Sequence, residues 1–289
     1  MAAILPRVGL RALRTLPRAT PVARGSFAST LPRTQLPLAQ PITRRFLATG
    51  IPEQPRLRLG STGMFMCPIA IISEALVANV RNAAPNFKAQ TTHGEIDFHE
   101  FIGNNWAILF SHPADFTPVC TTELGAFSKL KNEFDQRGVK MIGLSANDLS
   151  SHGDWVKDIN EVANTNVQFP IIADADRKVA FLYDMVDQRD IDSIAEKGIP
   201  FTIRSVFIID PAKKIRLIML YPASTGRNSA EVLRVIDALQ AADKKGIATP
   251  IDWNVGEDVI VPPSVSTEDA KKKFGEVREL KPYLRYTKF

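Results

Sequence analysis

The sequence predicts an α/β domain, in which a central β-sheet is flanked by helices, followed by a C-terminal stretch rich in prolines and charges. Short apolar runs with the length of buried strands alternate with segments whose apolar residues recur at helical spacing. Two later apolar runs, joined by a four-residue turn, predict a β-hairpin. A chain of 289 residues, 45% of them hydrophobic and 23% charged, can bury the core that such a domain needs.

The expected elements follow one another in a regular order along the chain. A hairpin is expected at 91–101, and further strands at 106–110, 139–145, 169–173, 204–210 and 215–221. Helices are expected at 123–134, 152–162, 178–185, from Asn228 or Ser229 to about residue 244, and at 267–274. Prolines and charges dominate after residue 248, and that stretch is too small for an independent core.

The first 50 residues differ in composition from the rest of the chain. They contain eight arginines and no lysine or acidic residue, so the remainder carries a net charge of 5 − 8 = −3. This composition is typical of a mitochondrial transit peptide, and a disordered basic tail is the alternative. We predict a transit peptide at 1–46, cleaved after Phe46 in the matrix, and a linker at 47–62.

The remaining composition excludes several classes of protein. A mildly acidic globular part argues against a nucleic-acid interface, and no apolar run is long enough to span a bilayer. Only Cys67 and Cys120 occur, without a C-x-x-C pair, which argues against a dithiol, a zinc site and a disulfide framework. The four histidines show no metal-ligand spacing, so we expect neither a metal nor a cofactor.

One stretch, residues 111–124, carries the chemistry. An apolar strand precedes it and a helix follows, so Cys120 falls in the first turn of that helix. Unpaired N–H groups and the positive end of a helix favour the thiolate, which is the reactive form of cysteine. Thr117 lies three residues earlier, where its hydroxyl could turn toward the same sulfur. A buried, inert thiol is the alternative, and this context disfavours it.

The stretch reads P-x-x-x-T-x-x-C within H-P-x-D-F-T-P-V-C-T-T-E-L, and it resembles the signature of one-cysteine peroxiredoxins of the peroxiredoxin-6-like branch. The resemblance covers about 84–289 and includes 202–207, 221–228 and 249–253 in the family's order. Together with the arginine-rich leader, it indicates a mitochondrial form, which we expect to be of fungal type. It also implies a thioredoxin-like peroxidase domain, which we assign to 84–223, and a C-terminal domain at 224–289 that packs across a homodimer.

The resemblance further implies a thiol-dependent peroxidase that reduces hydrogen peroxide and organic hydroperoxides in antioxidant defence. Cys120 would become a sulfenic acid, with Arg204 holding its thiolate. Thr117 would donate to or accept from the peroxide. The residues expected to build the site are Pro113, Thr117, Cys120 and Arg204, with Glu123 holding Arg204 and His112 as a further supporting candidate.

No resolving cysteine is evident, because Cys67 lies outside the family resemblance. We therefore expect an external thiol reductant, such as glutathione or a thioredoxin-type protein. A redox-regulated holdase chaperone or a peroxide-signalling relay is the alternative function. A thiol–disulfide exchanger is disfavoured, since it would need a second active-site cysteine.

The stretch 63–83 is anomalous, because the family has no insertion of this length there. Residues 60–62 and 84–87 would join cleanly without it, and its codons can read as a fungal-type intron whose removal deletes 84 − 63 = 21 residues in frame. Our hypothesis is a translated intron, and a membrane-surface or partner-binding helix is the alternative. An abundant native peptide containing Cys67 would contradict the hypothesis.

Overall fold

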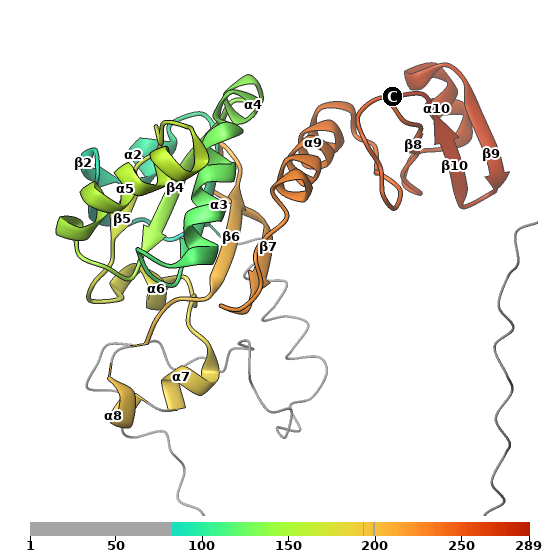
Figure 1. Ribbon diagram of the computed structural model, residues 1–289. Coiled ribbons are helices and arrows are strands. Elements are labelled where there is room, and N and C mark those ends of the chain that lie inside the picture. The colour runs from blue at the N-terminus through green and yellow to red at the C-terminus, as the bar shows by residue number, and fades with distance from the viewer. Residues whose placement is uncertain (1–82, 193, 199) are drawn as a thin grey trace, which may run out of the picture. The chain divides into compact units, whose positions relative to one another are not determined.

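The computed structural model describes residues 83–192, 194–198 and 200–289 (Figure 1). The predicted transit peptide, the linker and all but the last residue of the stretch 63–83 lie outside the described residues. Those three assignments therefore stay predictions.

The described chain forms a seven-stranded mixed sheet in the order β2-β1-β5-β4-β3-β6-β7 and a three-stranded sheet in the order β8-β10-β9. In the large sheet β3, β4 and β5 are parallel, and the other neighbours pair antiparallel. Its strands are β1 (Lys88–Thr91), β2 (Gly94–Asp97), β3 (Trp106–His112), β4 (Val139–Ser145), β5 (Ile171–Ala173), β6 (Arg204–Ile209) and β7 (Ile215–Tyr221). The small antiparallel sheet contains β8 (Val259–Ile260), β9 (Val277–Lys281) and β10 (Leu284–Thr287).

Along the chain, helices alternate with most of these strands, as the α/β prediction requires (Figure 1). They are α2 (Phe98–Ile102), α3 (Pro118–Lys129), α4 (Lys131–Gln136), α5 (Leu149–Ala163), α6 (Lys178–Leu182), α7 (Gln188–Asp192), α8 (Ile194–Lys197), α9 (Ser229–Lys245) and α10 (Thr267–Phe274). The predicted fold class is confirmed, while α2, α7 and α8 were not expected. The hairpin expected at 91–101 is formed by β1 and β2, and α2 follows it at once.

The helix expected at 123–134 differs from the structure at both its start and its middle. It begins earlier, at Pro118, because proline suits the first helical position, where an N–H would have no partner in any case. It also breaks at Leu130, whose N–H is shared among three carbonyls, so that α4 starts as a separate helix. Apolar spacing continues across the break to Phe134, which is why periodicity alone does not reveal it.

The expected helix 178–185 ends earlier, at Leu182. Asp184 has φ of 57°, a left-handed conformation that ends a right-handed helix. The expected strand 169–173 likewise pairs only from Ile171. Boundaries of this kind depend on single backbone conformations that composition does not encode.

Strand β3 lies in the middle of the sheet, and its side chains alternate between two hydrophobic cores. Ala107 and Leu109 contribute to one core, whereas Ile108 and Phe110 contribute to the other. Helices α2 and α6 supply residues to the first core, and α3, α5 and α9 supply residues to the second. The domain is therefore a three-layer α/β structure, with β3 fixed from both faces.

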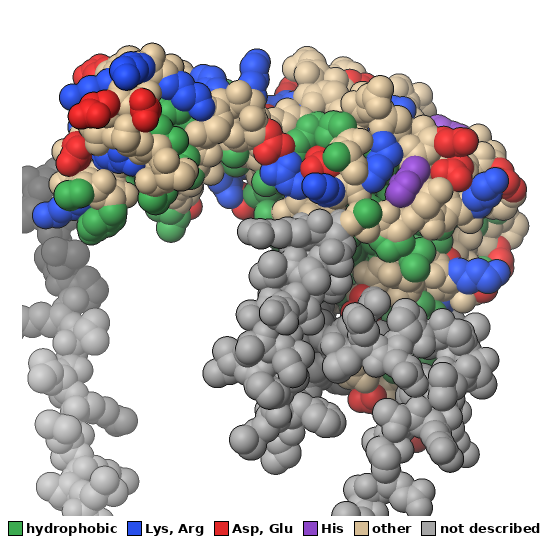
Figure 2. All heavy atoms as spheres, turned by 180° about the vertical axis from the view of Figure 1, so that it is seen from behind, with side chains coloured by type: hydrophobic (Ala, Val, Ile, Leu, Met, Phe, Trp, Pro, Cys, Tyr) green, Lys and Arg blue, Asp and Glu red, His purple; other side chains and the backbone are tan. Residues whose placement is uncertain are grey.

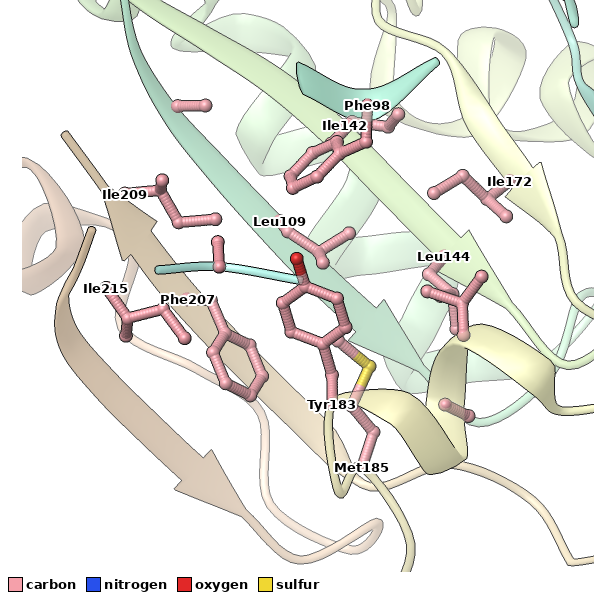
Figure 3. Close-up of a cluster of buried hydrophobic side chains, with 14 of the residues drawn as sticks. Phe98, Leu109, Ile142, Leu144, Ile172, Tyr183, Met185, Phe207, Ile209 and Ile215 are labelled. Carbon is pink, nitrogen blue, oxygen red and sulfur yellow. The ribbon is translucent and has the colours of Figure 1, made fainter. Parts of the chain in front are cut away.

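The first core is shown in Figure 3, where Leu109 and Tyr183 lie among aliphatic side chains of β4 and β6. The Tyr183 ring packs edge-on against Phe207, and its hydroxyl donates to the Pro85 carbonyl at 2.6 Å. Burial raises the pKa of Tyr183, so this hydroxyl stays a neutral donor. The core thus ties the start of the described chain to the sheet.

Helix α9 contributes to two hydrophobic clusters. Val232 and Ile236, in its first half, belong to the core shared with β3 and β6. Ala241, near its end, packs with Trp253 in a separate C-terminal cluster. The predicted boundary between residues 223 and 224 precedes this shared helix, and it stays a prediction.

The described surface shows no separation of charge by sign on the face drawn in Figure 2, where acidic and basic side chains lie interspersed. Within the described ranges, no helix combines the length and apolarity needed to cross a membrane. The expected lack of a nucleic-acid partner stays a prediction.

Candidate active site

The candidate site forms where β3 ends. After His112 the chain runs through a short loop that starts with the half-buried Pro113, and then enters α3 at Pro118. Cys120 is the third residue of α3 and has no exposed surface. It is a free thiol in the described chain. The strand–loop–helix placement predicted for this cysteine is therefore present.

Thr117 is the N-cap residue of α3, yet its side chain does not cap the helix. The Thr117 hydroxyl donates to the Ala114 carbonyl at 3.0 Å, while its own carbonyl accepts from the Thr121 N–H. This corrects the expectation that the hydroxyl turns to the Cys120 sulfur: a half-buried hydroxyl takes the nearest carbonyl acceptor, three residues back. The first amide groups of α3 are consequently left uncapped by this threonine.

Arg204, the first residue of β6, lies against the sulfur as the resemblance implied. Its Nη1 atom donates to Cys120 Sγ at 3.2 Å and to Glu123 Oε2 at 2.7 Å. Its Nε and Nη2 atoms both donate to the Ala223 carbonyl, at 2.9 and 2.7 Å. The guanidinium is thus fixed on three sides, and Glu123 makes the contact that was expected of it.

A second buried arginine, Arg227, completes the site. Its Nε and Nη2 atoms donate to the two carboxylate oxygens of Glu123 at 3.0 and 2.8 Å, and its backbone N–H adds a third bond at 2.7 Å. Its Nη1 atom donates to the carbonyls of Ser111 and Ser205, both at 2.9 Å. Arg227 therefore connects β3, α3 and β6 in one place.

Sequence reasoning missed Arg227, although it lies within the segment 221–228 that carries part of the resemblance. An arginine before a helix reads as a surface charge, and no periodicity distinguishes it. The available signal was the motif itself, because the segment 221–228 contains Arg227 as a second arginine beside Arg204 among the residues of the resemblance.

The Glu123 carboxylate offsets one of the two positive charges of Arg204 and Arg227. Burial opposes ionisation of Glu123, but Arg227 and Arg204 outweigh it and hold the pKa of this carboxyl below its ordinary value. Burial lowers the pKa of Arg227 against the opposing effect of Glu123. The three side chains are at most 5% exposed. Two guanidiniums and one carboxylate leave one positive charge, which a Cys120 thiolate neutralises.

His112 is not brought to the sulfur. Its side chain is fully buried, and its Nε2 atom lies 3.4 Å from Asp115 Oδ1. Its ring packs against the Trp155 ring, with 4.9 Å between the ring centroids. Among the described residues, no cluster of three or more histidine, cysteine, aspartate or glutamate side chains could hold a metal ion.

Comparison with known proteins agrees with this geometry. Residues 80–218 match the AhpC/TSA family, and residues 238–276 match the C-terminal domain of 1-Cys peroxiredoxin. The mitochondrial peroxiredoxin PRX1 of Saccharomyces cerevisiae is 56% identical over 237 residues, which is 82% of this chain and 90% of that protein. Human peroxiredoxin-6 is 50% identical over 216 residues, which is 71% of this chain and 95% of that protein.

Solved structures give the same relationship. A yeast mitochondrial 1-Cys peroxiredoxin, described in terms of thiol resolution through glutathione and thioredoxin systems, matches with a TM-score of 0.68 and 57% identity, covering 73% of this chain and 99% of that one. Peroxiredoxin 6 of Arenicola marina matches with a TM-score of 0.68 and 45% identity, covering 72% and 97%.

A buried cysteine at a helix N-terminus, bound by an arginine on a thioredoxin-like sheet, defines a thiol peroxidase. With these relatives, the chain belongs to the peroxiredoxin family, in its one-cysteine branch.

Proposed function

We propose that the Cys120 thiolate attacks one oxygen of a hydroperoxide. The sulfur–oxygen bond forms as the oxygen–oxygen bond breaks, which leaves a sulfenic acid on Cys120 and releases hydroxide or an alkoxide that takes up a proton. The observation that carries this proposal is the 3.2 Å contact between Arg204 Nη1 and Cys120 Sγ. The same cation is positioned to stabilise charge that develops on the departing oxygen.

We assign the other site residues by what their hydrogen bonds leave free. The Thr117 proton is used on the Ala114 carbonyl, so its oxygen lone pairs accept a hydrogen bond from the peroxide. The uncapped amides of Val119 and Cys120 donate to the peroxide oxygens. Pro113 shields the pocket from water, and Glu123 holds Arg204 in place. These roles deepen the sequence expectation, which left the direction of the Thr117 hydrogen bond open.

The sulfenic acid then needs an external thiol. Cys120 is a free cysteine in the described chain, and Cys67 lies outside it. The yeast structure named above concerns glutathione and thioredoxin systems, so we propose glutathione or a thioredoxin-type protein as the reductant here. Steady-state peroxide consumption by the purified protein, measured with each reductant alone, tests this. The proposal would be overturned if neither reductant supported turnover. It would also be overturned if a Cys120→Ser variant still consumed peroxide.

We also propose that the protein acts in the mitochondrial matrix as a homodimer. The arginine-rich leader and the mitochondrial yeast relative support the location. Strand β7 ends the seven-stranded sheet with half-buried side chains, which supports pairing with a second copy. An import assay with isolated mitochondria tests the location. Light scattering after size exclusion tests the dimer, and a monomeric mass would contradict it.

A further inference from the structure

Helix α5 contacts the active-site segment on both sides of Cys120. Before the cysteine, His152 Nδ1 lies 2.6 Å from Asp115 Oδ2. After it, Trp155 Nε1 donates to Thr121 Oγ1 at 3.1 Å. His152 and Trp155 are three residues apart, so they share one face of α5, and neither has exposed surface. The segment that carries the reactive sulfur is thus tied to α5 at two points.

Asp115 is the centre of the first tie. This carboxylate is 5% exposed and lies in the loop between β3 and α3. It has four side-chain neighbours in hydrogen-bond range: Ser145 Oγ at 2.6 Å, Ser151 Oγ at 2.5 Å, His152 Nδ1 at 2.6 Å and His112 Nε2 at 3.4 Å. The Asp115 N–H donates in addition to Asn147 Oδ1 at 3.0 Å. A loop residue with so many buried partners fixes the path of its loop.

The hydrogen bonds define the protonation of this cluster. Burial opposes the charge of Asp115, but donors that include His112 and His152 outweigh it and hold the pKa of this carboxyl well below its ordinary value. Each imidazole therefore donates an N–H to the carboxylate. The other ring nitrogens, His112 Nδ1 and His152 Nε2, are buried without a hydrogen-bond partner. A second proton on His112 would place a buried cationic N–H without an acceptor, and burial lowers the pKa of His112, so this imidazole is neutral.

We propose that Asp115 and His152 are positioning residues for the reaction at Cys120. They tie the loop that ends at Thr117 to α5, and the tie holds while the buried imidazole of His112 is neutral. The inference rests on the proposed role of Cys120 in peroxide reduction, and it adds residues that never touch the reacting atoms.

The path from this tie to the chemistry is short. Ala114 precedes Asp115 directly, and the Ala114 carbonyl accepts the Thr117 hydroxyl at 3.0 Å. A displaced Asp115 therefore turns the group that orients Thr117 toward the peroxide. Helix α5 is a firm support, because a Cβ on Gly125 of α3 would lie 2.5 Å from Ala163 Cβ of α5. Small displacements of this kind cost rate, since attack depends on alignment of the reacting atoms.

The direction of the pH dependence follows from the state in which Asp115 ties the loop to α5. Burial lowers the pKa of His112 against the effect of Asp115, with Arg227 and His152 as the other groups that act on it. An imidazole released into water takes a proton near pH 6.5. A loop released from α5 therefore binds more protons below that pH than the loop tied through Asp115. Acidification thus favours release of the loop. Peroxide reduction should therefore fall as the pH is lowered through about 6.5.

Two substitutions at one position test the inference. His152→Leu removes the donor to Asp115, whereas His152→Asn keeps a neutral N–H near the Nδ1 position and cannot titrate. We expect the bimolecular rate constant for peroxide, followed by stopped flow, to fall about tenfold in His152→Leu and to recover in His152→Asn. His93→Asn, at the exposed hairpin turn, is the matched control.

Thiolate absorbance, recorded in parallel, separates loss of the thiolate from loss of position. Equal rates in folded His152→Leu and wild type would overturn the inference, as would His152→Asn being no faster than His152→Leu. If His152→Leu does not fold, Asp115→Asn takes its place, and a wild-type rate in that variant would be equally contradictory. Failure of the underlying function appears separately, as peroxide reduction that survives Cys120→Ser.

Discussion

The Nη1 atom of Arg204 donates to the sulfur of Cys120 at 3.2 Å and to Glu123 at 2.7 Å. Glu123 in turn accepts three hydrogen bonds from Arg227. The distance between cation and sulfur is therefore set by a carboxylate that a second arginine holds. Sulfur, arginine and carboxylate form one unit, and changing any member should affect both charge balance and geometry.

The two cysteines should differ completely in their importance. We expect Cys120→Ser to abolish peroxide consumption, because a hydroxyl at this position lacks the nucleophilicity of a thiolate. Cys67→Ser should leave consumption unchanged, since Cys67 lies outside the family resemblance. Peroxide consumption with a fixed thiol reductant measures both. Equal loss in the two variants would contradict a mechanism with a single reactive cysteine.

Glu123→Gln should cost more stability than any surface ion pair. It leaves two buried guanidiniums without their carboxylate, and breaking a buried pair costs about 3–5 kcal/mol. Glu231→Gln is the matched control, because the Glu231–Arg234 pair is at least 28% exposed and such pairs contribute about 0–1 kcal/mol. Denaturant unfolding measures both free energies. Similar losses in the two variants would show that the cluster is not an electrostatic unit.

Thr117 should contribute through its oxygen and not through its bulk. Thr117→Val removes the acceptor and keeps the shape, and we expect a loss of about 10²-fold in the rate constant for peroxide. Thr117→Ser retains the hydroxyl and should retain most of the rate. Stopped-flow rates at saturating reductant measure the difference. A valine variant that reacts as fast as the serine variant would remove Thr117 from the mechanism.

The free energy of unfolding should fall in acid in two stages. The pKa of His112 is lowered by burial, so the unfolded chain binds more protons below about pH 6.5 and stability declines there. The pKa values of Asp115 and Glu123 are also lowered, so a second and steeper decline begins below about pH 5. Burial raises the pKa of Asp174, an effect of opposite sign.

Denaturant unfolding between pH 8 and pH 4 measures these two stages. Asp115→Asn should be less stable at neutral pH and should show a shallower decline below about pH 5. A parallel decline in wild type and variant would contradict the assignment of Asp115 as a buried anion.

How much the sequence predicts depends on the kind of signal involved. The strand–loop–helix position of Cys120 was predictable, because apolar period and proline placement are local properties. The partnership of Cys120 with Arg204, 84 residues apart in sequence, came only from the family resemblance. Periodicity contains no information about which distant strands become neighbours in a sheet.

The missed residues share a physical reason. Asp115 is a polar residue in a loop and His152 is a polar residue in a helix, and such residues usually face solvent. Only the fold reveals that they are buried and bonded to each other, 37 residues apart. Trp155 packs against the His112 ring, and its indole N–H also donates to the Thr121 hydroxyl oxygen.

Two glycines should respond in opposite ways to the same substitution. A Cβ on Gly125 would lie 2.5 Å from Ala163 Cβ, so Gly125→Ala forces α3 away from α5. Overpacking of this kind costs about 1–3 kcal/mol. A methyl group added to Gly153, within α5, would have no neighbour within 4 Å, and Gly153→Ala should stabilise the helix by about 0.5–1 kcal/mol.

Denaturant unfolding and peroxide kinetics on both variants separate packing from helix propensity. Because α5 ties the active-site segment through His152 and Trp155, we expect Gly125→Ala to slow peroxide reduction as well as to lower stability. Gly153→Ala should leave the rate unchanged, since it alters neither contact. A folded Gly125→Ala variant with wild-type stability and rate would show that the spacing between α3 and α5 is not what holds Cys120 in position.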